Sequence, residues 1–223
     1  MTRYVNIHVH RLPREEEIGL RTVGIHPWDA ERAAGLPEAA GLPEIAGLLE
    51  VTGLLEVTGL QGAGLPEAAG IQAVGEIGLD FAKGPAHEVQ AAALRAQLRM
   101  ACERGLPVVL HCVRAFEPLM RELAVREPRA VIFHGFIGSP QQARQALGRG
   151  YYLSFGVRTF ASPRSIEALR ATPSDRLFLE TDEDPAPIAA VYEEVARLRG
   201  ETVDALCAAT YGNYERLFGK QNG

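Results

Sequence analysis

The chain has 223 residues, 47% of them hydrophobic, and a formal net charge of −5. This length suits one domain with a single large core, and the acidic balance argues against nucleic-acid binding through a broad basic surface. The apolar runs are far shorter than the ~20 residues of a membrane span, no secretory signal follows Arg3, and three cysteines give no disulfide framework. We therefore expect one soluble, cytoplasmic domain over residues 1–223, with no membrane contact and no obligate protein partner.

Short apolar runs alternate with helical stretches, which is the pattern of an α/β protein with parallel strands. Residues 86–104 are predicted to form an amphipathic helix, and Ser139 and Ser162, each followed by proline, predict helix starts. Residues 186–218 read as two helices that pack outside the strands. The predicted strands, seven in number, lie near residues 3–9, 22–26, 71–77, 107–112, 130–135, 151–155 and 177–181.

The tract at about 35–69 consists of near-copies of six residues, such as GLPEAA, GLPEIA and GLLEVT. A six-residue step advances about 600° around a helix, which scatters the leucines, and the repeated glycine weakens a helix further. A left-handed β-helix would need more stacked coils than this tract supplies. We expect an inserted surface loop or weak helix that holds no metal-binding histidine.

Six residues that can bind a metal follow five of the apolar runs. His8 and His10 are two positions apart on one strand, so their rings project to the same side and can hold one cation. If parallel strands close into a barrel, their C-terminal ends meet on one face, where all six would converge. Otherwise each is a separately satisfied polar group, and all six follow strands by chance. The other four candidates are Glu76, His111, His134 and Asp182.

Eight blocks of sequence form a recognisable series: N-I-H-V-H at 6–10, G-I-H-P-W at 24–28, V-G-E-I-G-L-D at 74–80, L-P-V-V-L-H-C-V-R-A-F at 106–116, F-H-G-F-I-G at 133–138, Y-Y-L-S-F-G at 151–156, L-E-T-D at 179–182 and N-Y-E-R-L-F at 213–218. The series resembles the TatD-type metal-dependent hydrolases, particularly the short members of that family. The resemblance spans most of the chain. It implies an α/β, TIM-barrel-like (β/α) barrel of the metal-dependent hydrolase type.

The resemblance also implies a site for one or two divalent ions, which could be Mg, Mn or Zn. The best-known activity of the family is metal-dependent deoxyribonuclease action, so the implied reaction is hydrolysis of DNA phosphodiester bonds. Asp182 and Glu76 would be the catalytic carboxylates. The implied ligands are His8, His10 and Asp182 for the first ion and His111 and His134 for the second, with Glu76 bridging the two.

Two departures from the family pattern stand out. Many relatives have an aspartate where this chain has Asn6, so any hydrogen bond from this position to a histidine would lack the negative charge. Thirteen residues separate His10 from Gly24 in place of a longer stretch that holds a strand and a helix in most relatives. Because thirteen residues are too few for a β-α unit, we expect about seven recognisable strands and an open or distorted barrel on that side.

Several further residues are candidates for contacts around the ions. His26 ends a strand and is a candidate for substrate binding or for loop packing. Lys83 and Arg114 each follow a ligand-bearing strand and could contact a phosphate oxygen. Glu180 lies two residues before Asp182 on the same strand face, so it could hydrogen-bond a ligand histidine. Trp28 could stack on a base, although packing over the barrel mouth is the more common role of a loop tryptophan.

The leading hypothesis is a divalent-metal-dependent deoxyribonuclease that uses a metal-activated water. A second hypothesis keeps the metal site but changes the substrate to a small-molecule amide, lactone or phosphoester, because fold does not fix function. A third is an inactive binding module, suggested by the missing β-α unit and the repeat tract. The presence of all six ligand candidates argues against the third.

Overall fold

The computed structural model describes residues 3–35 and 70–219, which form two compact units. The continuous unit runs from Arg21 to Ile132. The discontinuous unit joins the chain up to Leu20 with the part that begins at Phe133. The hexad tract predicted as a surface insertion lies, apart from Gly35, outside the described residues.

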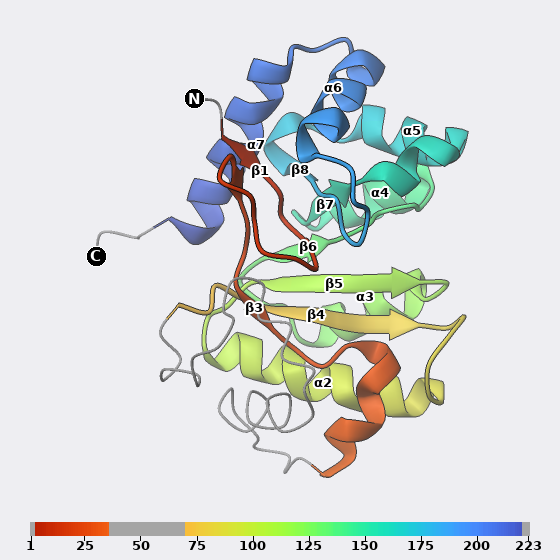
Figure 1. The fold of residues 1–223 in the computed structure, drawn as a ribbon. Helices are drawn as coiled ribbons and strands as arrows, with labels where there is room; N and C mark the ends of the chain where they lie inside the picture. The colour runs from red at the N-terminus through yellow and green to blue at the C-terminus, as the bar shows by residue number, and fades with distance from the viewer. Residues whose placement is uncertain (1–2, 36–69, 220–223) are drawn as a thin grey trace. The chain divides into compact units, whose positions relative to one another are not determined.

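The continuous unit is built on parallel strands in the order β3-β4-β5, with β3 at Thr22–Val23, β4 at Ala73–Asp80 and β5 at Val108–Val113. Figure 1 shows helix α2 (His87–Glu103) running alongside β4 and beside the 3-10 helix η1 (Pro27–Gly35). The strands are almost wholly buried because they are continuous apolar runs, as expected where a parallel sheet is covered by helices. Helix α3 (Phe116–Val125) follows β5.

A register shift between Val74 and Ile77 interrupts the pairing of β4 with β5. Such a bulge re-aims the side chain within it, and here that side chain is Glu76. Gly78 follows at φ +150°, and a Cβ at this position would lie 2.0 Å from the carbonyl oxygen of His111. Only glycine therefore allows this close approach of the two strands. The local sequence thus sets the placement of Glu76 and His111 on adjacent strands.

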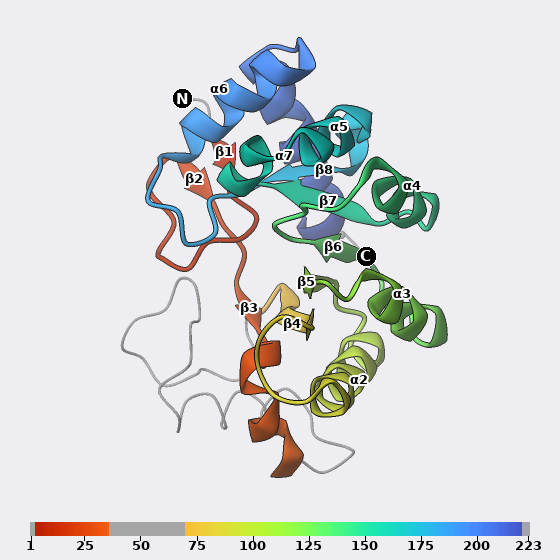
Figure 2. The same ribbon diagram turned by 90° about the vertical axis from the view of Figure 1, so that its right-hand side faces the viewer.

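The discontinuous unit contains two pairs of parallel strands. The first pair is β1 (Tyr4–Val5) with β2 (Glu17–Ile18), and the second is β7 (Tyr152–Phe155) with β8 (Leu177–Leu179). Figure 2 shows α4 and α5 beside β7 and β8. The other elements are β6 (Val131–Phe133), which contains the division between the units, α4 (Pro140–Gly148), η2 (Val157–Ala161), α5 (Pro163–Ala171), η3 (Ser174–Arg176), α6 (Ile188–Arg199) and α7 (Val203–Phe218).

Strand β2 depends on one buried carboxylate. The guanidinium of Arg11 donates to both carboxylate oxygens of Glu17, at 2.6 and 2.8 Å, and the backbone N–H of Arg14 donates at 3.0 Å. Burial alone would raise the pKa of Glu17, but these hydrogen bonds and the charge of Arg11 outweigh burial and hold the pKa below its usual value. The loop before β2 is therefore fixed by charge-assisted hydrogen bonds.

The last two helices are tied to the first and last strands. The hydroxyl of Tyr192 on α6 donates to the carbonyl of Val5 at 2.9 Å. The amide of Asn213 on α7 donates to the carbonyls of Ser174 and Leu177, both at 2.9 Å. These bonds satisfy backbone groups that would otherwise be buried without partners, so the helices complete the discontinuous unit.

All seven predicted strands, the helix at 86–104 and the two C-terminal helices are confirmed. Ser139 and Ser162 cap α4 and α5 as predicted, and Ser139 forms a capping box with Gln142. The structure differs from the prediction at β2, an eighth strand that lies within the thirteen residues after His10. These thirteen residues include no helix. Among the described residues, no helix is both long and apolar enough to cross a membrane.

Candidate metal centre

His8, His10 and Asp182 converge because two extended segments run side by side. The backbone N–H of Ile7 donates to the carbonyl of Leu179 at 3.1 Å, and that of Asp182 donates to the carbonyl of His8 at 3.1 Å. Asp182 has φ +54°, a left-handed conformation that aspartate tolerates better than most residues. The carboxylate of Asp182 therefore comes directly opposite the H-x-H pair.

The ligand atoms of these three residues suit one divalent ion. Nε2 of His8 lies 3.2 Å from Nε2 of His10, and Oδ1 of Asp182 lies 3.7 Å from the first nitrogen and 3.1 Å from the second. Donor atoms that share an ion at bond lengths of 2.0–2.2 Å lie about 2.9–3.6 Å apart. His8 and Asp182 are largely buried, whereas the side chain of His10 is 28% exposed. Two of the three separations lie in this range and the third, 3.7 Å, lies just above it, so the donor set suits a metal that solvent can reach.

His134 lies in the same unit, with its ring centroid 4.4 Å from that of His8. Nδ1 of His134 lies 3.3 Å from Oε1 of Glu180, an oxygen that also accepts the backbone N–H of Gly135 at 2.7 Å. Because Oε1 of Glu180 acts as an acceptor for Gly135, a proton on Nδ1 of the His134 ring would complete the second contact and leave the lone pair on Nε2. Glu180 thus contacts a histidine, as its spacing predicts, and the role of His134 as a metal ligand stays a prediction.

Asn6 contacts Thr181 instead of a histidine. Its amide nitrogen donates to the hydroxyl of Thr181 at 3.0 Å, and its amide oxygen accepts the backbone N–H of Thr181 at 3.0 Å. Both residues are fully buried. The side chain therefore holds the backbone immediately before Asp182, and the expectation that it orients a histidine directly is replaced by this indirect role.

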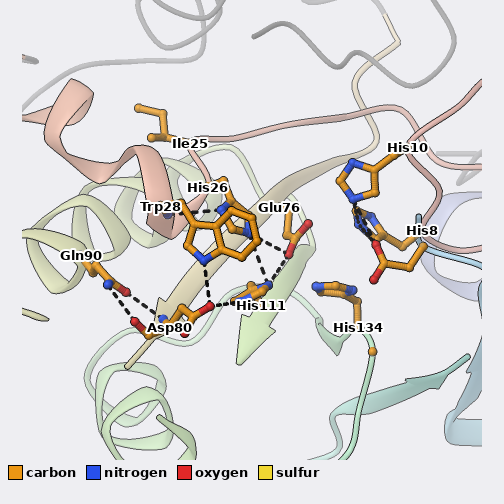
Figure 3. A network of polar contacts seen from close by, with 12 residues as sticks. His8, His10, Ile25, His26, Trp28, Glu76, Asp80, Gln90, His111 and His134 are labelled. Atoms are coloured by element: carbon orange, nitrogen blue, oxygen red, sulfur yellow. Dashed lines mark hydrogen bonds and ion pairs between the residues drawn. The ribbon is translucent and has the colours of Figure 1, made fainter. Parts of the chain in front are cut away.

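The continuous unit holds a second cluster formed by His26, Glu76 and His111 (Figure 3). Oε1 of Glu76 lies 2.5 Å from Nδ1 of His111 and 3.3 Å from Nε2 of His26. The backbone N–H of Trp28 donates to Nδ1 of His26 at 3.2 Å, so neutral His26 carries its proton on Nε2, the nitrogen that faces Glu76. His26 is therefore arranged as a hydrogen-bond donor in this cluster.

Asp80 sets the orientation of His111. Oδ2 of Asp80 lies 3.2 Å from Nε2 of His111 and accepts the indole N–H of Trp28 at 2.8 Å. Oδ1 accepts the backbone N–H groups of Ala82 and Lys83 at 2.8 and 3.0 Å. Burial alone would raise the pKa of Asp80, but the hydrogen bonds from Trp28, Ala82 and His111 outweigh it and lower that pKa. The carboxylate of Asp80 thus favours a proton on Nε2 of His111, in competition with Oε1 of Glu76, which lies 2.5 Å from Nδ1.

The sequence reasoning missed Asp80 and Gln90. Gln90 is buried and fixes the end of β4, because its amide accepts the backbone N–H of Asp80 and donates to the carbonyl of Asp80. A signal for Asp80 was available: it lies four residues after Glu76 on one strand, so an even spacing separates the two carboxylates. No comparable signal marks Gln90, which occupies an ordinary helix position.

The cationic candidates lie near the ends of their strands. The ammonium of Lys83 lies 3.3 Å from the centroid of the Trp28 ring. Arg114 directly follows β5, is exposed and has φ +52°. Their predicted contacts with substrate, and that of His26, stay predictions.

A pocket of about 260 Å³ opens beside Asp182 in the discontinuous unit. Thr159 and Glu180 line it, and Oγ1 of Thr159 and Oε2 of Glu180 are buried without hydrogen-bond partners among the described residues. The exposed Arg158 also borders the pocket. Buried polar atoms without partners are uncommon in folded proteins, so this lining suits a polar ligand.

The six predicted ligands thus divide between the two units. His8, His10, His134 and Asp182 gather in the discontinuous unit, and Glu76 and His111 pair in the continuous unit. The predicted sharing of ions between these groups, with Glu76 as a bridge, stays a prediction, as does the single domain over residues 1–223.

The family described as TatD related DNase matches residues 6–219 of the chain. The chain belongs to this family. A Bacillus subtilis relative named uncharacterized metal-dependent hydrolase YabD is 32% identical over 167 residues, which cover 66% of this chain and 65% of the relative. A Citrobacter rodentium relative named 3'-5' ssDNA/RNA exonuclease TatD is 32% identical over 173 residues, which cover 67% of this chain and 65% of the relative. The chain thus matches just under two thirds of the length of these TatD-family relatives.

A solved structure of a TatD homolog, YjjV from Escherichia coli, matches with a TM-score of 0.72 and 23% identity, covering 98% of this chain and 99% of that one. A hydrolase of the TatD family from Entamoeba histolytica matches with a TM-score of 0.71, covering 92% of this chain and 76% of that one. The predicted fold class is therefore confirmed: the chain has the α/β, TIM-barrel-like fold of TatD-family proteins.

Proposed function

We propose that this chain is a divalent-metal-dependent hydrolase that cleaves phosphodiester bonds of DNA. The observation that carries the proposal is the convergence of Nε2 of His8, Nε2 of His10 and Oδ1 of Asp182 within 3.1–3.7 Å. Membership of the TatD family and the name ssDNA/RNA exonuclease carried by several relatives support a nucleic-acid substrate.

In this proposal His8, His10 and Asp182 hold one divalent ion, and His134, His111 and Glu76 supply the remaining ligands for one or two ions. Bound ions would supply positive charge that polarises the phosphodiester and favours ionisation of water. Mixed imidazole and carboxylate donors are compatible with Mg²⁺, Mn²⁺ or Zn²⁺. Measuring the metal that the purified protein contains would identify the native ion.

The carboxylate of Asp182 is the proposed proton acceptor for the attacking water. Its side chain is 19% exposed, so water can reach it, and its backbone is held by the neighbouring Asn6–Thr181 contact. Glu76 is the second proposed catalytic carboxylate. Glu180 and Asp80 act on His134 and His111, respectively, by keeping a proton on the nitrogen that faces each carboxylate.

The pocket beside Asp182 is the proposed place for part of the substrate. Its unpaired Thr159 hydroxyl and exposed Arg158 offer donors to sugar or phosphate oxygens. Arg158 matters here because Glu183 and Asp184 also line the pocket and would repel an anionic strand. The net charge of −5 gives the chain no broad attraction for nucleic acid, so a phosphate in this pocket needs a nearby positive side chain such as Arg158.

The test is degradation of single-stranded DNA, duplex DNA and RNA by the purified chain, with bound metal measured in the same samples. We expect DNA cleavage with Mg²⁺ or Mn²⁺ and none after chelation. Asp175→Asn, an exposed carboxylate change on η3, should retain full activity. A metal-loaded protein that leaves nucleic acid intact but hydrolyses amides, lactones or small phosphoesters would replace the proposal with the second hypothesis. Inactivity on every substrate would favour a binding module.

A further inference from the structure

Trp28, the single tryptophan of the chain, presents its indole ring to solvent. The residue lies at the start of η1 and is 40% exposed, so it is not packed away in the core. Its ring is nevertheless fixed, because the indole N–H donates to Oδ2 of Asp80 at 2.8 Å and the His26 ring lies edge-on at a centroid distance of 4.6 Å. An exposed aromatic ring held by its polar end is preorganised to accept another ring on its face.

The ring stands beside the cluster of His26, Glu76 and His111 (Figure 3). The Trp28 backbone N–H binds His26, and the His111 ring centroid lies 6.1 Å from that of the indole. A nucleotide whose phosphate is held at the cluster would therefore have its base close to the indole. Asp80 contacts both Trp28 and His111, so the aromatic surface and a proposed metal ligand share one support.

Lys83 occupies the face of the indole in this structure, with its ammonium 3.3 Å from the ring centroid. Its side chain is exposed and, among the described residues, has no carboxylate partner. A cation–π contact at an exposed site is weaker than stacking of a nucleobase on an aromatic ring. A base can therefore displace the flexible lysine, and the displaced ammonium is then available to a phosphate oxygen.

Resting on the proposed nuclease function, we propose that Trp28 is a stacking platform for one nucleobase and that Lys83 is an exchangeable cover that moves to the phosphate when the base arrives. Stacking requires an unpaired base, because the faces of bases within a duplex are covered by their neighbours. It tolerates any base identity, since every base has a π-face. The chemical class of ligand is therefore a single-stranded nucleotide segment without base preference.

The test compares cleavage of a single-stranded DNA oligonucleotide with cleavage of an abasic tetrahydrofuran strand of equal length and charge. For the wild-type protein we expect the abasic strand to raise KM about 5- to 160-fold, the range that one base–aromatic stack of about 1–3 kcal/mol implies. The fluorescence of the single tryptophan, recorded on rapid mixing, should be quenched by the base-bearing strand and not by the abasic strand.

Three variants separate the proposed stacking of a base on Trp28 from the contact with Asp80 that Trp28 shares with His111. Trp28→Leu should lose the preference for the base-bearing strand. Trp28→Phe keeps a ring but not the N–H to Asp80, so it should retain most of the preference while kcat falls. Lys83→Met should lower the slope of log KM against log salt by about 0.7, the value for one phosphate contact on a single strand. Tyr211→Leu, which removes an exposed aromatic ring from α7, is the matched control and should change none of these.

The outcomes distinguish the two proposals. If the wild-type protein cleaves both strands with equal KM, and the fluorescence is unchanged, Trp28 does not stack a base although the nuclease function stands. If neither strand is cleaved by the metal-loaded protein, the proposed function itself is wrong and the stacking role falls with it. A preference that persists in Trp28→Leu would also overturn the assignment to this residue.

Discussion

Asn6 and Thr181 are 175 positions apart in the chain and exchange two buried hydrogen bonds of 3.0 Å each. One of these bonds satisfies the backbone N–H of Thr181, and the other joins the two side chains. The next residue is Asp182, so this pair of bonds fixes the backbone from which the proposed proton acceptor projects.

Asn6→Leu should lower the free energy of unfolding by about 1–3 kcal/mol, because the Thr181 N–H is left buried without a partner. Thr181→Val should cost a similar amount, because it keeps the bond to the backbone N–H but leaves the buried Asn6 amide N–H without its acceptor. Urea unfolding of both single variants and of the double variant, all in the presence of chelator, gives the coupling free energy between Asn6 and Thr181. Effects that add to within about 0.5 kcal/mol would show that the pair is not energetically linked.

Asp80→Asn should weaken metal binding by about 10- to 100-fold, the usual range for loss of a carboxylate behind a ligand histidine. The two backbone N–H groups that contact Oδ1 would retain the amide oxygen, so the amide NH₂ would face His111 and Trp28. His111 could accept this hydrogen bond only by moving its proton to Nδ1, the atom that faces Glu76. Nitrogen NMR of the metal-free protein reads this tautomer directly.

Asp29→Asn is the control for that change, because it neutralises a partly exposed aspartate of η1 in the same unit. It should leave both the tautomer of His111 and metal affinity unaltered. An Asp80→Asn protein with an unchanged His111 tautomer would contradict the orientation argument even if its activity were low.

Asp182→Asn should lower the turnover rate at least about 10²-fold, the lower range for loss of a general base, because it keeps the shape and removes the basicity. His111→Ala should instead act mainly by lowering metal occupancy. Measuring turnover and bound metal together in both variants separates the two roles. Full activity of Asp182→Asn would remove this residue from the proposed mechanism.

The contribution of Glu17 to stability should depend on pH. The folded-state pKa of Glu17 lies below its usual value, so its stabilising effect is complete above the unfolded pKa of about 4.3 and is lost as the pH falls through the folded pKa. The difference in unfolding free energy between the wild type and Glu17→Gln should therefore be constant near neutrality and shrink on acidification below about pH 4. Urea unfolding between pH 7 and 3 measures it.

The exposed pair of Glu194 and Arg197 provides a comparison for this measurement. Glu194→Gln should change stability much less at every pH, because solvent screens an exposed ion pair. Equal effects of the two substitutions would mean that burial of Glu17 adds nothing to its pairing with Arg11.

The sequence predicts the elements that carry their own signal. Seven strands are apolar runs, and two helices begin at a serine followed by proline, so all are visible without tertiary information. Strand β2 is not, because Glu17 is charged and the strand exists only through pairing with β1 and the contacts of Arg11. Helix α3 begins at Phe116 without a side-chain cap and offers no start signal.

In the candidate site too, some features have a local sequence signal and others depend on contacts between distant segments. The ligand candidates could be predicted because each follows an apolar run that forms or leads into a strand, where polar residues are uncommon. The contacts that set the histidine tautomers could not, since each joins segments distant in the chain, such as His111 with Asp80 or His134 with Glu180. Asn6 illustrates the limit: its position suggests contact with a histidine, but its amide pairs with the backbone of another strand.

The interrupted course of the discontinuous unit sets an order of assembly during synthesis. A ribosome makes Val5, His8 and His10 roughly 170 to 190 residues before Asp182 and the Tyr192 hydroxyl that binds Val5. The stretch from Arg21 to Ile132 has its strands in direct succession and can acquire structure first, since nearby contacts close with less loss of chain entropy. Until the later segment is made, the first histidines have neither their carboxylate nor the helix that anchors their strand. The nascent chain therefore acquires the His8–His10–Asp182 centre only after Asp182 has been made.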